Sequence, residues 1–147
     1  MGYNEENTKG RERLRALVSS LTDEELSLQT GGDWTVAALL AHLAFWDFRV
    51  LGLMQRWKNE GVGRSPIDID IVNDATKPLC SAIPGREAGK LVHSAAQAVD
   101  AELEHIPEDL MPGITALVQE GKFRLDRSLH RNEHLDQIDK LLAEFRS

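Results

Sequence analysis

Apolar residues recur three or four positions apart through most of the chain, the spacing of helices with one buried face. The clearest example begins at Asp33 or Thr35, either of which can cap a helix, and is expected to reach Glu60. Its seam is Leu39, Leu43, Trp46, Val50, Leu53 and Trp57. Strand signals are weak, because β-branched residues do not cluster and no Asn-Gly or Asp-Gly turn joins alternating runs. The chain is therefore predicted to be all-α.

Three further long helices are expected from the same spacing, over residues 5–21, after Pro84, and over residues 122–145. The inner stripe of the helix after Pro84 is predicted to be Ala88, Leu91, Val92, Ala95, Val99, Leu103 and Ile106. Four such helices are typical of a four-helix bundle, and 147 residues suit one domain over positions 1–147.

Shorter elements are expected between the long helices. Thr22 opens a capping box that predicts a short helical turn, and Gly31-Gly32 breaks the chain. A modest helical piece is expected over residues 71–82. Residues 107–121 hold two prolines and two glycines, so they are predicted to form a connection with room for one helical turn.

Charge and cysteine content narrow the classes of partner and compartment. The formal net charge of −7 argues against nucleic acid and against an anionic membrane surface, and it favours capture of a cation. The N-terminus lacks the apolar core of a signal peptide, and the longest apolar stretch, residues 37–46, is too short to span a bilayer. Cys80 is the only cysteine, which excludes an internal disulfide and a cysteine-based zinc cluster. A cytoplasmic protein is expected.

Two histidines one turn apart lie on the inner face of the last predicted helix. With Leu141 set at zero, His134 lies at roughly +20° and His130 at roughly −20°. His42 is the one polar side chain of its apolar stretch and lies about 60° from Leu39, at the edge of the seam. If the second and fourth helices face each other, the three imidazoles can meet. Two histidines four residues apart on one helical face are a recurrent way to hold a transition metal.

A competing interpretation is that each histidine is a core residue hydrogen-bonded to a carbonyl group. Convergence favours a metal, because each buried imidazole needs its own partner and repels the others once protonated. Three neutral imidazoles suit zinc, nickel, iron or copper better than magnesium or calcium. His93 and His105 fall off the inner stripe of their helix and are expected to be solvated.

The letters of residues 130–134, HRNEH, also match the H-x-x-E-H motif of inverted zinc proteases. Those enzymes take an acidic ligand from well downstream, whereas thirteen residues follow His134. Glu133 also lies about 100° from His134 around the helix. The match is therefore interpreted as accidental, with Glu133 a solvated carboxylate that could still act as a base near a metal.

Two segments resemble motifs of the DinB-like superfamily. Residues 33–47, DWTVAALLAHLAFWD, are similar to its second-helix signature, a Trp-Ser/Thr helix start followed by a His-Leu/Ile pair. His130-x3-His134-x2-Gln137-Ile138 is similar to its closing motif on the last helix. The order and separation of the two segments fit the family, so the resemblance covers nearly the whole chain.

The resemblance implies an up-down-down-up four-helix bundle, often dimeric, in which His42, His130 and His134 hold one divalent ion. The better understood members are transferases or isomerases that use low-molecular-weight thiols such as bacillithiol or mycothiol, and they are not DNA polymerases. The mycothiol-dependent isomerases carry a further C-terminal domain, whereas this sequence ends at Ser147.

The first functional hypothesis is a metal-dependent thiol S-transferase or hydrolase that uses zinc or nickel, with iron or another ion as alternatives. No fourth protein ligand is evident, so an open position could hold water or a thiolate. Asp47 or Glu133 could orient a histidine, but no catalytic residue is assigned. The expected partners are a small-molecule substrate or thiol co-substrate and a second copy of the chain. The alternatives are a non-catalytic protein in which the ion ties two helices together and a module whose function is dimerisation.

Overall fold

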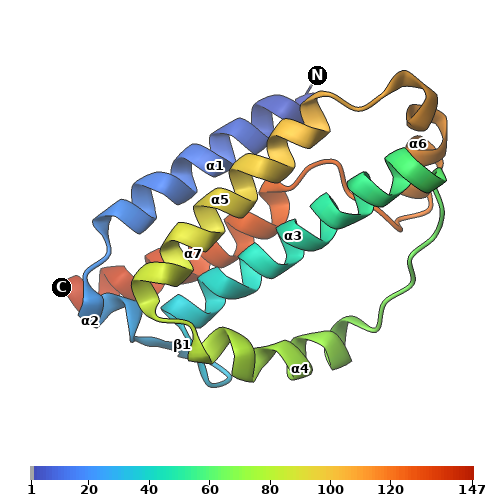
Figure 1. Ribbon diagram of the computed structural model, residues 1–147. Helices are drawn as coiled ribbons and strands as arrows, with labels where there is room; N and C mark the ends of the chain where they lie inside the picture. Colours follow the sequence, from blue (N-terminus) through green and yellow to red (C-terminus); the bar gives the residue numbers. More distant parts are fainter. Residues whose placement is uncertain (1) are drawn as a thin grey trace.

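Four long helices dominate the computed structural model, which describes residues 2–147. They are α1 (Gly2–Ser20), α3 (Val36–Glu60), α5 (Gly85–Glu104) and α7 (Ser128–Arg146). α1 packs against α5 and α7, and α3 packs against the same two helices. α1 and α7 run in one direction and α3 and α5 in the opposite one, the order called up-down-down-up (Figure 1). The prediction of an all-α fold is confirmed.

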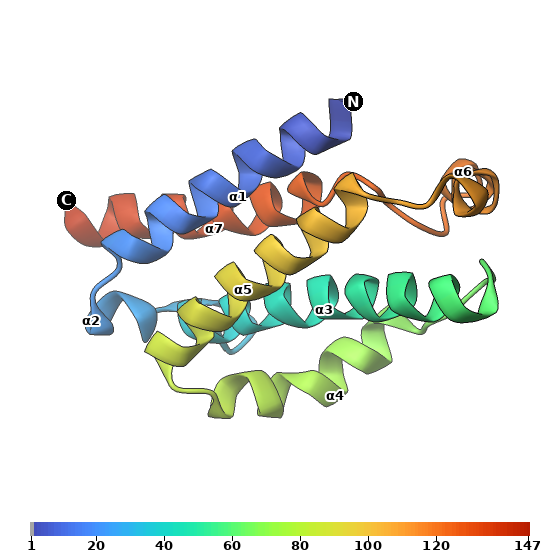
Figure 2. The ribbon, with the colours of Figure 1, turned by 45° about the horizontal axis from the view of Figure 1, so that its top comes forward.

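The chain returns along the bundle between α3 and α5, because these two helices run in the same direction. Residues 61–68 and α4 (Ile69–Ala82) form this return and lie along α3 (Figure 2). α4 begins two residues earlier than predicted, because the Asp68 carboxylate accepts a hydrogen bond from the Ile71 N–H (3.2 Å) and caps the helix. Cys80 is the one buried residue of α4, so this helix covers the bundle and contributes a single side chain to its core.

Short elements join α1 to α3. The predicted capping box is present at α2 (Asp23–Leu26), where Thr22 and Glu25 bond each other's backbone N–H groups at 3.1 and 2.9 Å. A two-stranded hairpin follows, which the weak strand signals did not predict, formed by β1 (Gln29–Gly31) and β2 (Trp34–Thr35). Thr35 caps α3 by accepting a hydrogen bond from the Ala38 N–H at 3.0 Å, which settles the choice between Asp33 and Thr35.

The connection between α5 and α7 contains more helix than expected. A 3-10 turn, η1 (Glu108–Leu110), leads into α6 (Met111–Gln119), so the prediction of one helical turn over residues 107–121 is wrong. Pro112 stands in the first turn of α6, where a missing N–H costs no hydrogen bond. A Cβ at Gly113 would lie 2.9 Å from the Cβ of Val62, so glycine allows α6 to pack on the chain after α3.

α7 begins at Ser128 rather than near residue 122. Phe123 instead buries its ring against Trp57, with centroids 5.0 Å apart. Asn7 of α1 then accepts hydrogen bonds from the backbone N–H groups of Arg127 (2.7 Å) and Ser128 (3.2 Å). The Asp126 carboxylate also accepts from the Ser128 N–H at 2.8 Å, so a side chain of α1 and a local carboxylate share the cap of α7.

Apolar side chains form two buried clusters along the bundle. In α3 the first cluster ends at Ala44 and the second begins at Val50, and buried charged residues lie at the level between them. The predicted stripe of α5 is correct at five of its seven positions. Leu91 is 37% exposed because it lies about 100° from Val92 around the helix, and Ile106 is half-buried and lies beyond the end of α5. α3 is long and apolar enough to cross a membrane, but 67% of its most apolar window is buried, as in the core helix of a soluble helical domain.

Candidate metal centre

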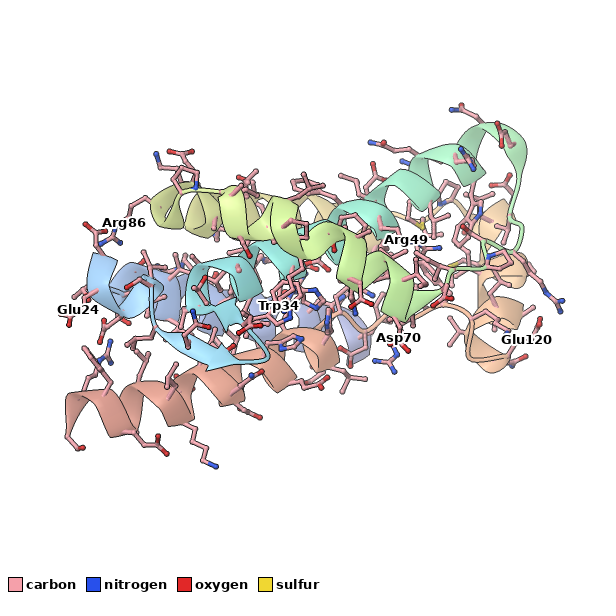
Figure 3. All side chains as sticks on the ribbon, turned by 90° about the horizontal axis from the view of Figure 1, so that it is seen from below. Glu24, Trp34, Arg49, Asp70, Arg86 and Glu120 are labelled. Carbon is pink, nitrogen blue, oxygen red and sulfur yellow. The ribbon has the colours of Figure 1, made fainter. Side chains whose placement is uncertain are left out.

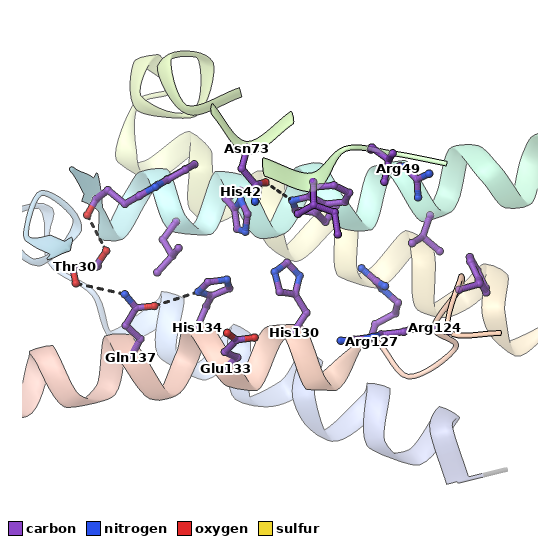
Figure 4. Close-up of a pocket in the computed structure, with 18 of the residues that line it drawn as sticks. Thr30, His42, Arg49, Asn73, Arg124, Arg127, His130, Glu133, His134 and Gln137 are labelled. Carbon is purple, nitrogen blue, oxygen red and sulfur yellow. Dashed lines mark hydrogen bonds between the residues drawn. The ribbon is translucent and has the colours of Figure 1, made fainter. Parts of the chain in front are cut away.

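α3 and α7 bring the three predicted histidines together. His42 projects from α3, and His130 and His134 project from α7 toward it (Figure 4). The ring centroid of His42 lies 5.3 Å from that of His130 and 5.1 Å from that of His134, and the two rings on α7 are 4.9 Å apart. One nitrogen from each ring lies within 4.8 Å of the other two.

Burial favours the neutral form of His42 and His130. His42 is 7% exposed, and its Nδ1 atom has no hydrogen-bond partner among the described residues. Desolvation, followed by the nearby His134, lowers the pKa of His42 from 6.5 to about 4. Desolvation, followed by His134 and His42, lowers the pKa of His130 from 6.5 to about 3. At neutral pH both rings therefore present nitrogen lone pairs, the form that binds a metal.

His134 is oriented by a hydrogen-bond chain. Its Nδ1 lies 3.2 Å from the Oε1 atom of Gln137, whose Nε2 donates to the Thr30 carbonyl at 3.4 Å (Figure 4). Because the amide oxygen of Gln137 faces the ring, Nδ1 is the protonated nitrogen and Nε2 is left as the lone-pair donor. Gln137 thus fixes both the tautomer and the orientation of the His134 ring.

The residues present fit a divalent ion that prefers nitrogen. Zinc–imidazole bonds of about 2.0–2.1 Å require nitrogens roughly 3.3 Å apart, which small side-chain rotations can reach from the observed spacing. The unpaired Nδ1 of His42 is a buried polar atom that a metal bond would satisfy. Among residues 2–147 no cysteine or carboxylate joins this group, which leaves coordination positions open.

Comparison with known proteins gives the family. A family model described as the DinB superfamily matches residues 6–138, and the match includes all three histidines. The chain belongs to the DinB superfamily. Searches of curated proteins and of solved structures return no match. Membership in the DinB superfamily thus agrees with the resemblance of residues 33–47 and 130–138 to the motifs of that family. The family match itself does not specify a reaction.

The carboxylates of Asp47 and Glu133, which could have oriented a histidine in this DinB-superfamily chain, form no hydrogen bond to one among the described residues. The prediction for Asp47 is wrong, because its carboxylate binds Arg127 Nε (3.0 Å) and Arg131 Nη2 (3.0 Å) instead. Glu133 is exposed and lines the cavity beside the histidines, without a hydrogen bond to them within the described chain. Away from the site, His105 is exposed as expected, whereas His93 is half-buried.

Four buried charged residues form an ionic layer behind the histidines, Asp47, Asp100, Arg127 and Arg131, and the half-buried Arg11 joins it through Asp100. Arg131 is 1% exposed and donates to Asp47 at 3.0 Å and to Asp100 at 2.8 Å. A sequence signal for it exists, because Arg131 lies seven positions before Ile138 and so shares its inner face. Asp47 likewise follows Leu43 by four positions, on the seam of α3.

A cavity of about 620 Å³ opens at the three histidines. Its apolar lining includes Trp34, Leu39, Trp46, Val50, Ile67 and Phe123. Seen from below, Trp34 lies between α4 and α7 (Figure 3). The indole N–H of Trp46 donates to Asn73 of α4 at 3.1 Å, so the return segment is tied to the cavity wall. A small molecule could therefore reach the histidines through a cavity that has both apolar and charged walls.

Proposed function

We propose that this protein binds one divalent metal ion, zinc or nickel, through His42, His130 and His134. We propose further that it acts in the cytoplasm as a thiol S-transferase or hydrolase, with residues 1–147 forming one domain. The observation that carries the proposal is the position of three converging imidazoles at an open cavity of about 620 Å³. A purely structural metal site is normally closed by four protein ligands, whereas a catalytic site keeps a position open.

The bound ion would supply acidity, lowering the pKa of a thiol or water molecule beside it to near neutral. The residues of the chain do the rest. His42 and His130 stay unprotonated at neutral pH, so protons compete little with the metal. Gln137 holds His134 in one orientation. The apolar side chains of the cavity lining would lower the local dielectric beside the reacting groups and so strengthen electrostatic interactions with them.

The first experiment is elemental analysis of purified protein, compared with the variants His130→Ala and His134→Ala. His105→Ala is the matched control, because His105 is exposed and bonds only the Ala101 carbonyl of its own helix. The expected result is about one equivalent of metal in the wild type and control and little in the site variants. Equal metal contents in all four proteins would contradict the proposed ligands.

Thiol chemistry is tested on the metal-loaded protein by calorimetric titration with cysteine-based cellular thiols, followed by turnover assays with electrophiles. Binding and turnover that disappear in His130→Ala support the enzyme. Full metal occupancy without thiol binding, turnover or hydrolysis would support the non-catalytic alternative, in which the ion ties α3 to α7.

Exposed apolar side chains on α4 favour the third alternative, a homodimer. Ile69, Ile71 and Leu79 are 57%, 62% and 69% exposed. Ile71 and Leu79 lie about 80° apart around α4, on the same side of the helix, and apolar residues exposed on one side of a helix can mark an interface. Analytical ultracentrifugation tests this: a dimer that Ile71→Lys converts to a monomer supports it, and a monomeric wild type contradicts it.

A further inference from the structure

Cationic side chains gather at one end of the histidine cavity. The charged residues of its lining are Arg49, Lys122, Arg124, Arg127 and Glu133, four positive and one negative. The whole chain carries a net charge of −7, so this excess of positive charge is local and opposes the overall balance. Glu133 lies beside His130 and His134, whereas Arg49, Arg124 and Arg127 lie together beyond His130 (Figure 4).

The geometry of the two site helices explains why two arginines face each other here. Arg49 follows His42 by seven positions on α3, and Arg127 precedes His134 by seven positions on α7. Seven residues are about two turns, so each arginine shares the face of its histidine and lies about 10 Å along the helix from it. Because α3 and α7 run in opposite directions, both displacements point to the same end of the cavity.

Arg49 has no carboxylate partner among the described residues. Its Nη2 donates to the backbone carbonyl (2.9 Å) and the hydroxyl oxygen (3.0 Å) of Ser65, both of which are neutral. Arg127 is paired with Asp47, but that carboxylate is shared with Arg131. Desolvation, followed by repulsion from Arg127, holds the pKa of Arg49 below its usual value. The half-buried guanidinium thus lies in a positive field that an anion would relieve.

We propose that this end of the cavity binds a carboxylate group of a small molecule through Arg49, with Arg124 and Arg127 adding positive charge. A guanidinium with free N–H groups matches a carboxylate through two parallel hydrogen bonds. Trp46, which lies between His42 and Arg49 on α3 and lines the cavity, suits the hydrocarbon part of the same molecule. The ligand class is therefore a carboxylic acid that extends about 10 Å toward the three imidazoles.

The place of this ligand in a reaction rests on the proposed function, but anion binding does not need the metal. The direct test is calorimetric titration of metal-free protein with glutarate at low salt, using the neutral diamide glutaramide as the matched ligand. The variants are Arg49→Gln and the control Arg56→Gln, an exposed arginine of α3 that faces Glu60. We expect glutarate to bind the wild type and Arg56→Gln alike, about tenfold or more weakly to Arg49→Gln, and glutaramide to bind none of them.

Equal glutarate affinities for Arg49→Gln and Arg56→Gln, or no binding to the wild type, would overturn the proposal. Arg49→Lys keeps the positive charge but not the paired N–H donors, so it is expected to bind glutarate with intermediate affinity. This second variant also controls for a loss of binding that is caused by misfolding of Arg49→Gln. Repeating the titration with His130→Ala separates the carboxylate site from the proposed metal site. If this variant still binds glutarate, the carboxylate site is supported even if the metal proposal fails.

If turnover with a thiol is found, a second arm locates the carboxylate. Turnover is measured with mercaptosuccinate and with its neutral diamide at a fixed electrophile. A KM for mercaptosuccinate that rises in Arg49→Gln, with the KM for the diamide unchanged, places the carboxylate on the thiol. If Arg49→Gln raises the KM only for a carboxylated electrophile, the carboxylate that Arg49 binds belongs to the electrophile. If Arg49→Gln leaves the KM of every carboxylated substrate unchanged, the result contradicts the proposed site.

Discussion

Acidification of the metal-free protein is predicted to destabilise it through His42 and His130. Their folded-state pKa values are about 4 and about 3, against an ordinary value of 6.5. Between these limits the unfolded chain binds protons that the folded chain does not, so the stabilisation is present above pH 6.5 and is lost as the pH falls. Between pH 7 and pH 5.5 the lowered pKa of each histidine reduces the free energy of unfolding by about 1.2 kcal/mol. Because both side chains contact solvent through the cavity, the combined loss is expected to be roughly 2 kcal/mol.

The size of this effect depends little on the exact folded pKa values, because both lie well below pH 5.5. Urea unfolding of chelator-treated protein, followed by tryptophan fluorescence at pH 7 and pH 5.5, measures it. The double variant His42→Gln/His130→Gln should lose most of the pH dependence, and the single variants about half each. His105→Gln, which changes an exposed histidine, should behave as the wild type. A pH dependence that the double variant retains in full would refute the reasoning.

Three further predictions concern single side chains. Gln137→Leu should weaken metal binding about 10- to 100-fold in competition with a chromophoric chelator, because His134 loses its orienting bond; unchanged affinity would contradict this. Arg131→Met should lower the free energy of unfolding in urea by about 3–5 kcal/mol, since it leaves two buried carboxylates short of a partner; a loss under 1 kcal/mol would contradict it. Thr35→Ala should cost about 1 kcal/mol in thermal unfolding and Thr35→Ser far less, whereas equal losses would exclude capping as the cause.

The four long helices could be predicted because each carries its own apolar seam, which is a local property. Helix ends that depend on distant residues could not. α7 starts where Asn7, 120 residues away from Arg127 in sequence, binds its backbone. The sequence does not predict α6, because Pro112 and Gly113 are typical of a break. In the structure Pro112 occupies the first turn of the helix, and Gly113 leaves room for Val62.

The histidine group could be predicted because two of its members lie one turn apart on a single helix and the third interrupts an apolar run. The ionic layer was missed, although Asp47 and Arg131 occupy seam positions and carry opposite charges. Gln137 was noted in the motif without a role, because its partner Thr30 lies in a hairpin that was not expected. The role of Arg49 depends on how α3 and α7 lie against each other, which seam patterns alone do not give.

The ionic layer also sets the axial register of α7. Interfaces made of leucine and alanine tolerate several alignments, because sliding one helix by a turn replaces one apolar contact by another. Such a slide, about 5.4 Å, would carry Arg131 away from both Asp47 and Asp100 and leave buried charges unpaired. It would also move the adjacent His130 a full turn past His42. Charges outside the histidine group thus favour the one alignment in which the three imidazoles meet.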